Sequence, residues 1–336
     1  MNTYHINLLE ERPASGVRQV MGSVPCVATV GFFDGVHLGH QFVVSQLCRL
    51  AQANGLQTAV VTFDNHPRQV LDPTWQPQLL TPIDEKCEEL SRLGIDHLFV
   101  MHFDSQTAQL PARDFMLQLQ RKVGVRMLLT GYDNRFGRRS TVTQPDGTVR
   151  EEGFDDYVGY GRQLGIQVVR SQSFEVSGIH VSSSVIRRLI TAGEVYKAYK
   201  CLGHPYFLYG RVVEGHQIGR QLGYPTANVR LSSPSKLVPA QGVYGVRCKI
   251  DGSRELLPGM MNIGLRPTFH GTGRTIEVYL FDYKGNLYGQ GLGIAVMFYH
   301  RSEQKFDTPE ALVRQLQQDA ADIKSTLQPV KTVKPC

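Results

Sequence analysis

The sequence predicts an α/β protein in two parts, a parallel β-sheet with helices followed by an antiparallel β-barrel that ends in a helix. Up to about residue 175, apolar strand-like runs alternate with helical patterns, as in repeated βα units. From about Tyr206 the strands become short and are separated by glycine turns, which is typical of an antiparallel barrel. A length of 336 residues leaves enough apolar sequence for two cores.

The elements of the first part follow from hydrophobic period and boundary residues. Helices are expected at residues 41–54 and 83–93, the second with Thr81 as its cap and Pro82 as its first position. Parallel strands joined in this way cross over right-handedly, and ligands bind beyond their carboxyl ends. The predicted strands are residues 26–33, 58–63, 97–103, 126–132 and 167–174.

In the second part, the helix after Arg187 is expected to run to about Lys200, and a C-terminal helix to begin at Thr308 and Pro309. The apolar face of this last helix would carry Leu312, Leu316, Ile323 and Leu327. The predicted barrel strands are residues 206–213, 242–250, 275–281 and 292–299. The expected domains are residues 1–187 and 205–330, with a linker helix region at 188–204.

Composition excludes several classes of protein. The net charge of +6 and the pI near 9.0 come from scattered basic residues, so anionic small molecules explain them as well as nucleic acid would. The six cysteines form no CxxC pair, which argues against a disulfide framework or a metal knuckle. No signal peptide and no membrane-spanning run are evident, so we expect a cytoplasmic, reduced protein.

The most informative segment reads TVGFFDGVHLGHQ, from Thr29 to Gln41. An apolar strand breaks at Asp34 and Gly35, and two histidines follow at the mouth of a helix. The first amides of a helix lack internal partners and attract phosphate.

Within this segment, His37 and His40 are three residues apart and share one face, with Gly39 between them. Their N–H groups suit the charge that develops on departing pyrophosphate, so a triphosphate site is predicted. The alternatives are a surface histidine pair, or a zinc site for which no third and fourth ligands appear at useful spacing.

A second anion site is predicted at VSSSVIRRLI. Ser182, Ser183 and Ser184 offer an N-cap, and Arg187 lies in the helix that follows. The alternative is an ordinary capped helix with solvated arginines. The histidine motif and this segment lie near the two ends of one domain in the sequence, and together they would bind the triphosphate from two sides.

The barrel part carries GRQLGYPTAN, in which Gly219 and Gly223 allow a close approach of backbone to ligand. Thr226 and Asn228 are two apart and face the same way if extended, and such oxygens suit magnesium carrying a phosphate. Glu277, in phase with aromatic residues on its strand, suits a general base toward a hydroxyl.

These barrel features have plainer interpretations too. PTAN alone is often a turn leading into a strand, and Glu277 could be a solvent-facing glutamate. Arg301 and Glu303 would then form a surface ion pair worth little.

Five motifs in one order, GFFDGVHLGH, VSSSVIR, GRQLGYPTAN, NIGLRPTF and IEVYLFD, make the chain resemble the bacterial bifunctional riboflavin kinase/FAD synthetase family from about residue 15 to 325. The resemblance implies a Rossmann-like nucleotidyltransferase domain that is an FMN adenylyltransferase, followed by a riboflavin kinase barrel. ATP would phosphorylate riboflavin to FMN, and a second ATP would adenylylate FMN to FAD with release of pyrophosphate. Each step would need Mg²⁺.

The resemblance also implies roles for residues. His37 and His40 would steady the ATP phosphates, with Arg187 and the three serines gripping from the other side. Thr226 and Asn228 would hold magnesium and phosphate, and Glu277 would take the proton of the ribityl 5′-hydroxyl. Further contacts to nucleotide or flavin would come from Gly31, Phe32, Asp34, Gly35, Gly39, Asp133, Ser182, Ser183, Ser184, Gly219, Gly223, Thr226, Asn228 and Arg301.

Flavin and adenine contacts are expected near residues 62–67 and 131–137. The chain departs from the family pattern at three positions: Asp133 stands where Asn is common, Phe32 also replaces an Asn, and Asn65 replaces a frequent Pro.

The expected partners are riboflavin, FMN and ATP, with no nucleic acid, no membrane and no obligatory protein partner. One alternative is a nucleotidyltransferase for another phosphorylated alcohol, fused to a barrel that only binds. Another is a basic nucleic-acid-binding regulator, although the sequence lacks basic stripes with interleaved aromatics.

Overall fold

The computed structural model describes residues 1–10, 24–131, 136–138, 140–143, 146–172, 174–176, 179–214, 223–268 and 271–327. The chain divides into two compact units, Met1–Val181 and Ser182–Cys336, named here the sheet unit and the barrel unit. The predicted limits at residues 187 and 205 stay predictions.

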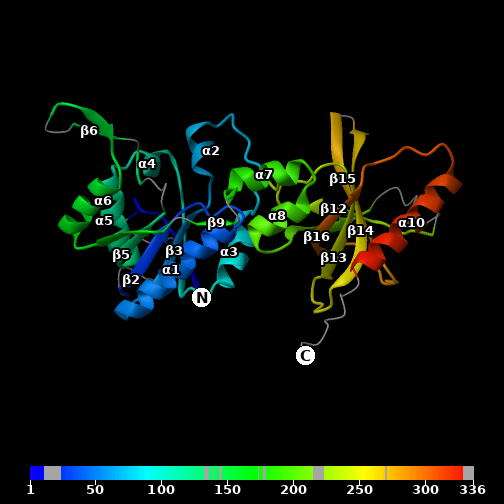
Figure 1. Ribbon diagram of the computed structural model, residues 1–336, viewed down its shortest axis with the longest axis horizontal. Helices are drawn as coiled ribbons and strands as arrows, with labels where there is room; N and C mark the ends of the chain where they lie inside the picture. The colour runs from blue at the N-terminus through cyan, green and yellow to red at the C-terminus, as the bar shows by residue number, and fades with distance from the viewer. Residues whose placement is uncertain are drawn as a thin grey trace. The chain divides into compact units, whose positions relative to one another are not determined.

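The sheet unit is built on six parallel strands in the order β1-β4-β3-β2-β5-β8, which confirms the predicted parallel sheet (Figure 1). β2, β3, β4 and β5 are almost entirely buried, as expected of strands covered on both faces. The edge strand β1 was not predicted. The bounds are β1 (Asn2–Ile6), β2 (Cys26–Val30), β3 (Gln57–Phe63), β4 (His97–Met101), β5 (Val125–Thr130) and β8 (Gln167–Arg170).

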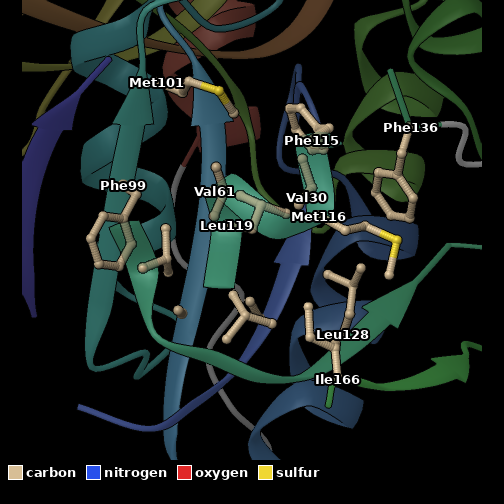
Figure 2. Close-up of a cluster of buried hydrophobic side chains, with 14 of the residues drawn as sticks. Val30, Val61, Phe99, Met101, Phe115, Met116, Leu119, Leu128, Phe136 and Ile166 are labelled. Atoms are coloured by element: carbon tan, nitrogen blue, oxygen red, sulfur yellow. The ribbon is translucent and has the colours of Figure 1, made fainter. Parts of the chain in front are cut away.

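Helices cover both faces of this sheet and seal two apolar cores. α1 (Leu38–Asn54) and α3 (Ile83–Ser91) cover one face, where Leu47 and Leu90 are fully buried. α5 (Ala112–Val123) and α6 (Phe154–Leu164) cover the other. Figure 2 shows Phe115 and Met116 of α5 beside Val30 of β2 in this second core.

Short elements complete the sheet unit. They are α2 (Pro67–Leu71), α4 (Ser105–Ala108), the hairpin of β6 (Thr141–Thr143) with β7 (Val149–Glu151), and the pair β9 (Glu175–Val176) and β10 (Ile179–His180).

The barrel unit contains a closed antiparallel barrel in the order β11-β12-β15-β14-β13-β16, as predicted. Two of its strands, β12 and β14, were not among the predicted strands, and the sequence of β14 is rich in turn residues. The bounds are β11 (Tyr206–Val213), β12 (Ala227–Leu231), β13 (Gly242–Ile250), β14 (Leu257–Thr268), β15 (Gly271–Leu280) and β16 (Gly291–Arg301).

Two helices precede the barrel, α7 (Ser183–Thr191) and α8 (Val195–Leu202). The prediction of one helix running to about Lys200 was wrong, because the chain breaks at Gly193 with φ of 78°, which only glycine adopts readily.

The last helix, α10 (Pro309–Leu327), packs its apolar face on the outside of the barrel. Thr308 caps it, since its Oγ1 accepts a hydrogen bond from the N–H of Ala311 at 3.2 Å. Ile323 and Leu327 are buried against Phe281 of the barrel unit, which confirms the predicted face. Among the described helices, none has the length and apolar character needed to cross a membrane.

Candidate active sites

His37 and His40 lie at the N-terminus of α1, which follows the carboxyl end of β2. His37 is the N-cap residue, and its Nδ1 accepts a hydrogen bond from the N–H of His40 at 3.4 Å. The imidazole rings stack with centroids 3.7 Å apart, which confirms that they share one face. A Cβ on Gly39 would lie 3.2 Å from the His37 ring, so the absence of a side chain keeps the stack open.

The turn that presents the histidines is strained and tied down. Phe33 and Val36 have φ of 52° and 39°, a region that non-glycine residues seldom adopt. The buried carboxylate of Asp34 accepts hydrogen bonds from the N–H groups of Leu80 at 3.1 Å and Thr81 at 2.9 Å. Strain of this kind costs on the order of 1–3 kcal/mol per residue and concentrates at functional sites.

Thr81 serves this turn instead of capping α3. Its Oγ1 accepts a hydrogen bond from the N–H of Gly35 at 2.8 Å, and Pro82 is the N-cap of α3 without any side-chain bond. The predicted cap was therefore wrong. Asp34 and Gly35 frame the turn, and their predicted nucleotide contacts, like those of Gly31 and Gly39, stay predictions.

The environment of His40 keeps its imidazole neutral at ordinary pH. Burial lowers its pKa well below 6.5, and the nearby His37 and Lys86 lower it further. Its ring lies between that of His37 and that of Phe33, the latter 5.1 Å away. Nδ1 of His40 is buried and has no hydrogen-bond partner among the described residues, so one ring nitrogen is left for a ligand.

Lys86 was missed by the sequence reasoning. In the run IDEKCEEL it looks like part of a solvated helix face, yet it is 1% exposed. Its Nζ lies 3.7 Å from the centre of the Phe32 ring. The Phe32 ring in turn meets His66 at 4.5 Å, and His66 meets Trp75 at 4.6 Å.

An aromatic cavity of about 1080 Å³ opens at the carboxyl end of β2, among the segments that follow β3, β4 and β5. Phe63 and Phe103 line it with rings 5.0 Å apart, and Phe115 and Phe136 with stacked rings 6.1 Å apart. Such walls suit a flat aromatic ligand. Phe63 and Phe136 belong to the two segments predicted to contact flavin or adenine, whereas Phe103 was missed.

The remaining residues predicted for the first site lie in α7 or outside the described residues. Ser182 is the N-cap of α7, and its Oγ accepts a hydrogen bond from the N–H of Val185 at 3.4 Å. Arg187 is half-buried on the same helix. These residues and the intervening Ser183 and Ser184 belong to the barrel unit, so their convergence with the histidines stays a prediction. Asp133 and Gly219 lie outside the described residues.

In the barrel, three predicted residues come together across neighbouring strands. Asn228 of β12 and Glu277 of β15 are direct cross-strand partners. Oγ1 of Thr226, just before β12, donates a hydrogen bond to Oε2 of Glu277 at 3.2 Å. Glu277 is half-buried, and this hydrogen bond orients its carboxylate. It is therefore not a freely solvated glutamate. Gly223 is exposed with φ of 81° in the turn before this group.

A further amide and carboxylate extend this row. Asn262 of β14 is the cross-strand partner of Glu277 on its other side, and its Nδ2 donates to Oε1 of Glu303 at 3.5 Å. Asn262 lies in the NIGLRPTF motif, and only the register of β14 with β15 reveals its place. Hydroxyl, amide and carboxylate oxygens of this kind are ligands that Mg²⁺ accepts. No group of three or more His, Cys, Asp or Glu residues suited to a metal is present in the described part of the chain.

Arg301 is not the partner of Glu303 in a surface pair, so that interpretation was wrong. Its guanidinium bonds to the fully buried carboxylate of Asp319 on α10, with Nη2 to Oδ2 at 2.6 Å and Nε to Oδ1 at 2.9 Å. Burial raises the pKa of Asp319, but the hydrogen bonds from Arg301 and Gln315 outweigh it and hold the pKa below 3.8. The predicted ligand contact of Arg301 stays a prediction.

Thr226 also lines a cavity of about 520 Å³ in the barrel unit. Tyr283, Lys284 and Tyr288 line the same cavity, so an ammonium and two aromatic rings lie near the Thr226 hydroxyl. This composition suits an anionic ligand that carries a ring.

Two family models together match most of the chain. The riboflavin kinase model matches residues 202–327, and the FAD synthetase model matches residues 21–185. A Listeria monocytogenes bifunctional riboflavin kinase/FMN adenylyltransferase is 36% identical over 301 residues, covering 89% of this chain and 91% of that protein. The chain belongs to this family. A Bacillus subtilis protein of the same description is 34% identical over 330 residues, covering 95% and 96%.

Members of the bifunctional riboflavin kinase/FMN adenylyltransferase family convert riboflavin to FMN and FMN to FAD with ATP, and this chain carries both activities. The match of residues 202–327 to a kinase excludes the alternative of a barrel that only binds.

A solved structure described as a macrolide-efflux protein from Streptococcus pneumoniae has the same fold, with a TM-score of 0.79 and 29% identity, covering 96% of this chain and 98% of that one. That description is a statement about the streptococcal protein. The fold it shares with this chain spans both the sheet unit and the barrel unit.

Proposed function

We propose that adenylyl transfer takes place at the His37–His40 turn of the sheet unit and riboflavin phosphorylation at Thr226, Asn228 and Glu277 of the barrel unit. The observation that carries this assignment is that each unit holds its own cluster of catalytic donor groups. One is a stacked histidine pair at a helix N-terminus, and the other is a hydroxyl that orients a carboxylate beside an amide.

In adenylyl transfer, a phosphate oxygen of FMN attacks the α-phosphorus of ATP, and the bond to the β-phosphate bridging oxygen breaks. FMN phosphate is already an anion, so no strong base is needed. The need is for donors that follow negative charge onto pyrophosphate. Neutral His40 offers one ring N–H for this purpose, and the free amides at the start of α1 offer more.

The aromatic cavity is the proposed seat of the flavin ring. Phe63, Phe103 and Phe136 provide apolar walls at the same edge of the sheet as the histidine turn. Arg138 also lines the cavity and gives it a cation for the phosphate of FMN. A volume of about 1080 Å³ accommodates a tricyclic ring with its ribityl chain.

In the kinase step, Glu277 is the proposed base that accepts the proton of the ribityl 5′-hydroxyl as its oxygen attacks the γ-phosphorus of ATP. The hydrogen bond from Thr226 to Oε2 holds the Glu277 carboxylate in place for this role. The bond between the γ-phosphorus and the β-bridging oxygen breaks, and ADP leaves.

The oxygen donors of Thr226 and Asn228 fit Mg²⁺, which we propose as the metal of this site. Bound there, the ion would neutralise charge on the transferred phosphate. Ser182, Ser183, Ser184 and Arg187 remain a proposed second anion site, and the cytoplasm remains the proposed location.

Two variants of the full chain test the assignment, with flavins separated by chromatography. His40→Ala should leave riboflavin conversion to FMN intact while FAD formation falls on the order of 10²–10³-fold. Glu277→Gln should block FMN formation while supplied FMN is still adenylylated. His5→Ala and Glu255→Gln, at exposed positions, are the matched controls. If either active-site variant stays folded and loses both activities, the assignment is wrong.

A further inference from the structure

Lys86 is a buried cation beneath the histidine turn. Its Nζ donates to Oγ1 of Thr62 and to the carbonyl of Phe63, both at 3.4 Å, and faces the ring of Phe32 at 3.7 Å. Within the described residues no carboxylate oxygen comes within 4.0 Å of it. Its surroundings are therefore a hydroxyl, a carbonyl and an aromatic ring, in place of a counter-ion.

Such a lysine opposes folding. An ammonium removed from water without an ion partner is unfavourable, and burial lowers the pKa of Lys86 from 10.5 to about 8. The carboxylates of Asp34 and Asp64 and the thiol of Cys87 oppose this shift without cancelling it. A methionine would fill the same volume without the penalty, so the charge itself calls for a function.

The ammonium of Lys86 lies where it would attract a bound polyanion. Thr62 donates from Oγ1 to the carbonyl of Phe32 at 3.2 Å, so Lys86, Thr62 and Phe32 form one connected group between the ends of β2 and β3. The same ammonium lowers the pKa of His40, which shows that its field reaches the histidine pair. The groups that face it are Asp34 of the turn, His40 of α1, Asp64 after β3, and Cys87 of its own helix.

We propose that Lys86 is a positioning residue for adenylyl transfer, one that fixes the Phe32 end of the turn and supplies a positive charge at neutral pH behind His37 and His40, drawing the triphosphate of ATP onto the N-terminus of α1. This inference rests on the proposed assignment of adenylyl transfer to the histidine turn.

A titration follows from the proposal. As pH rises through about 8, Lys86 loses its proton and adenylyl transfer should weaken, chiefly through a higher KM for ATP. The kinase activity of the same chain serves as an internal reference, because its site belongs to the barrel unit. Below the native pKa, Lys86 is charged in the folded state, and the full cost of burying that charge lowers the free energy of unfolding. Stability should therefore increase as pH rises from about 8 toward the ordinary value of 10.5.

The experiment uses the full chain with Lys86→Met, Lys86→Arg and, as control, Lys122→Met on α5. FAD formation from FMN and ATP is measured on both sides of pH 8. Unfolding of the sheet unit is followed by the fluorescence of Trp75, the single tryptophan. Lys86→Met should raise the KM for ATP about tenfold at neutral pH, abolish the alkaline decline and raise the unfolding temperature. Lys86→Arg should stay active at alkaline pH, because its charge persists.

A second variant, Phe32→Leu, should move the alkaline decline to higher pH, because water then reaches the ammonium. The proposal is overturned if Lys86→Met keeps both its KM and the alkaline decline, or if it lowers the unfolding temperature while Lys86→Arg loses activity equally. If His40→Ala retains adenylyl transfer, the site assignment fails. If His40→Ala loses adenylyl transfer as expected while the Lys86 variants behave like wild type, the site assignment stands and only the inference about Lys86 fails.

Discussion

The two units solve the same problem, holding ATP beside a flavin oxygen, with opposite electrostatics. The sheet unit gathers His37, His40 and Lys86 around a strained turn, in which the carboxylate of Asp34 is bound to backbone amides. The barrel unit gathers Thr226, Asn228 and Glu277, so that a carboxylate lies beside a hydroxyl and an amide, and we propose that this carboxylate acts as the base. The difference matches the nucleophiles, since FMN phosphate is already ionised while a ribityl hydroxyl must lose a proton.

The comparison also concerns rigidity. In the sheet unit the reactive turn carries positive φ at Phe33 and Val36 and is pinned to residues 80 and 81. In the barrel unit the reactive residues lie on or next to ordinary strands whose register fixes them. One site is made by local strain and the other by long-range pairing.

The largest effect should come from mixing two inactive chains. His40→Ala and Glu277→Gln each block riboflavin conversion to FAD at a different step, so an equimolar mixture should restore it on the order of 10²–10³-fold over either chain alone. The measurement is FAD formed from riboflavin and ATP. A mixture as inactive as its components would break the division into two independent sites.

Next in size is a stability effect confined to the barrel unit. Asp319→Asn leaves the Arg301 guanidinium without its counter-ion, and breaking a buried pair in this way costs about 3 kcal/mol. Loss of kinase activity after heating should occur at a lower temperature, whereas the Trp75 fluorescence transition of the sheet unit should not move. An equal shift of both would show that the units unfold together.

The same pair makes a pH prediction. The pKa of Asp319 is held below 3.8 in the folded state, so its stabilising effect is present above that value and is lost as pH falls through the lowered native pKa. Wild type should therefore lose barrel stability in acid more steeply than Asp319→Asn. Thermal unfolding at a series of acid pH values checks this, and parallel curves would contradict it.

A smaller effect should follow from Thr226→Val. Removing the hydroxyl that bonds to Glu277 costs about 2 kcal/mol, or about thirtyfold in kinase kcat/KM, with adenylyl transfer unaffected. Thr275→Val, two residues before Glu277 on the same face, is the matched control. Equal losses in both variants would indicate a general effect on β15.

The smallest effect tests the surface of the sheet unit. Arg92 pairs with Glu88 at 2.6 Å while both side chains are more than half exposed, so Arg92→Ala should change stability by less than about 0.5 kcal/mol. Urea unfolding followed by Trp75 fluorescence is the measurement. Leu90 of α3 is fully buried in the core, which indicates that this helix is held mainly by apolar packing. A larger loss would mean that the packing holds α3, the helix that carries Lys86, less firmly.

The sequence predicted the pairs His37/His40 and Thr226/Asn228 because each rests on short spacing, and it singled out Glu277 by the phase of its strand. The register that sets Asn228 opposite Glu277 agrees with the phase of the two strands. The single helix predicted to run to about Lys200 was wrong because the chain breaks at Gly193, and the Thr81 cap was wrong because the turn at Asp34 uses that hydroxyl.

Lys86, Asn262 and the Arg301–Asp319 bond could not be predicted, because they depend on which elements pack together. A lysine among glutamates looks solvated until α3 is docked on its sheet. Asn262 lies in a stretch of glycine and proline that resembles a loop, and Asp319 meets Arg301 only when α10 folds back on β16. Tertiary packing decides such residues, and local pattern does not report it.

The closure of the barrel sets an order of events during synthesis. β11 hydrogen-bonds to β16, so the first barrel strand at Tyr206–Val213 lacks one edge partner until residues 291–301 have left the ribosome. All six strands of the parallel sheet, by contrast, are translated before residue 171. The nascent chain can thus complete its adenylyl-transferring half while its kinase half still waits for its final strand.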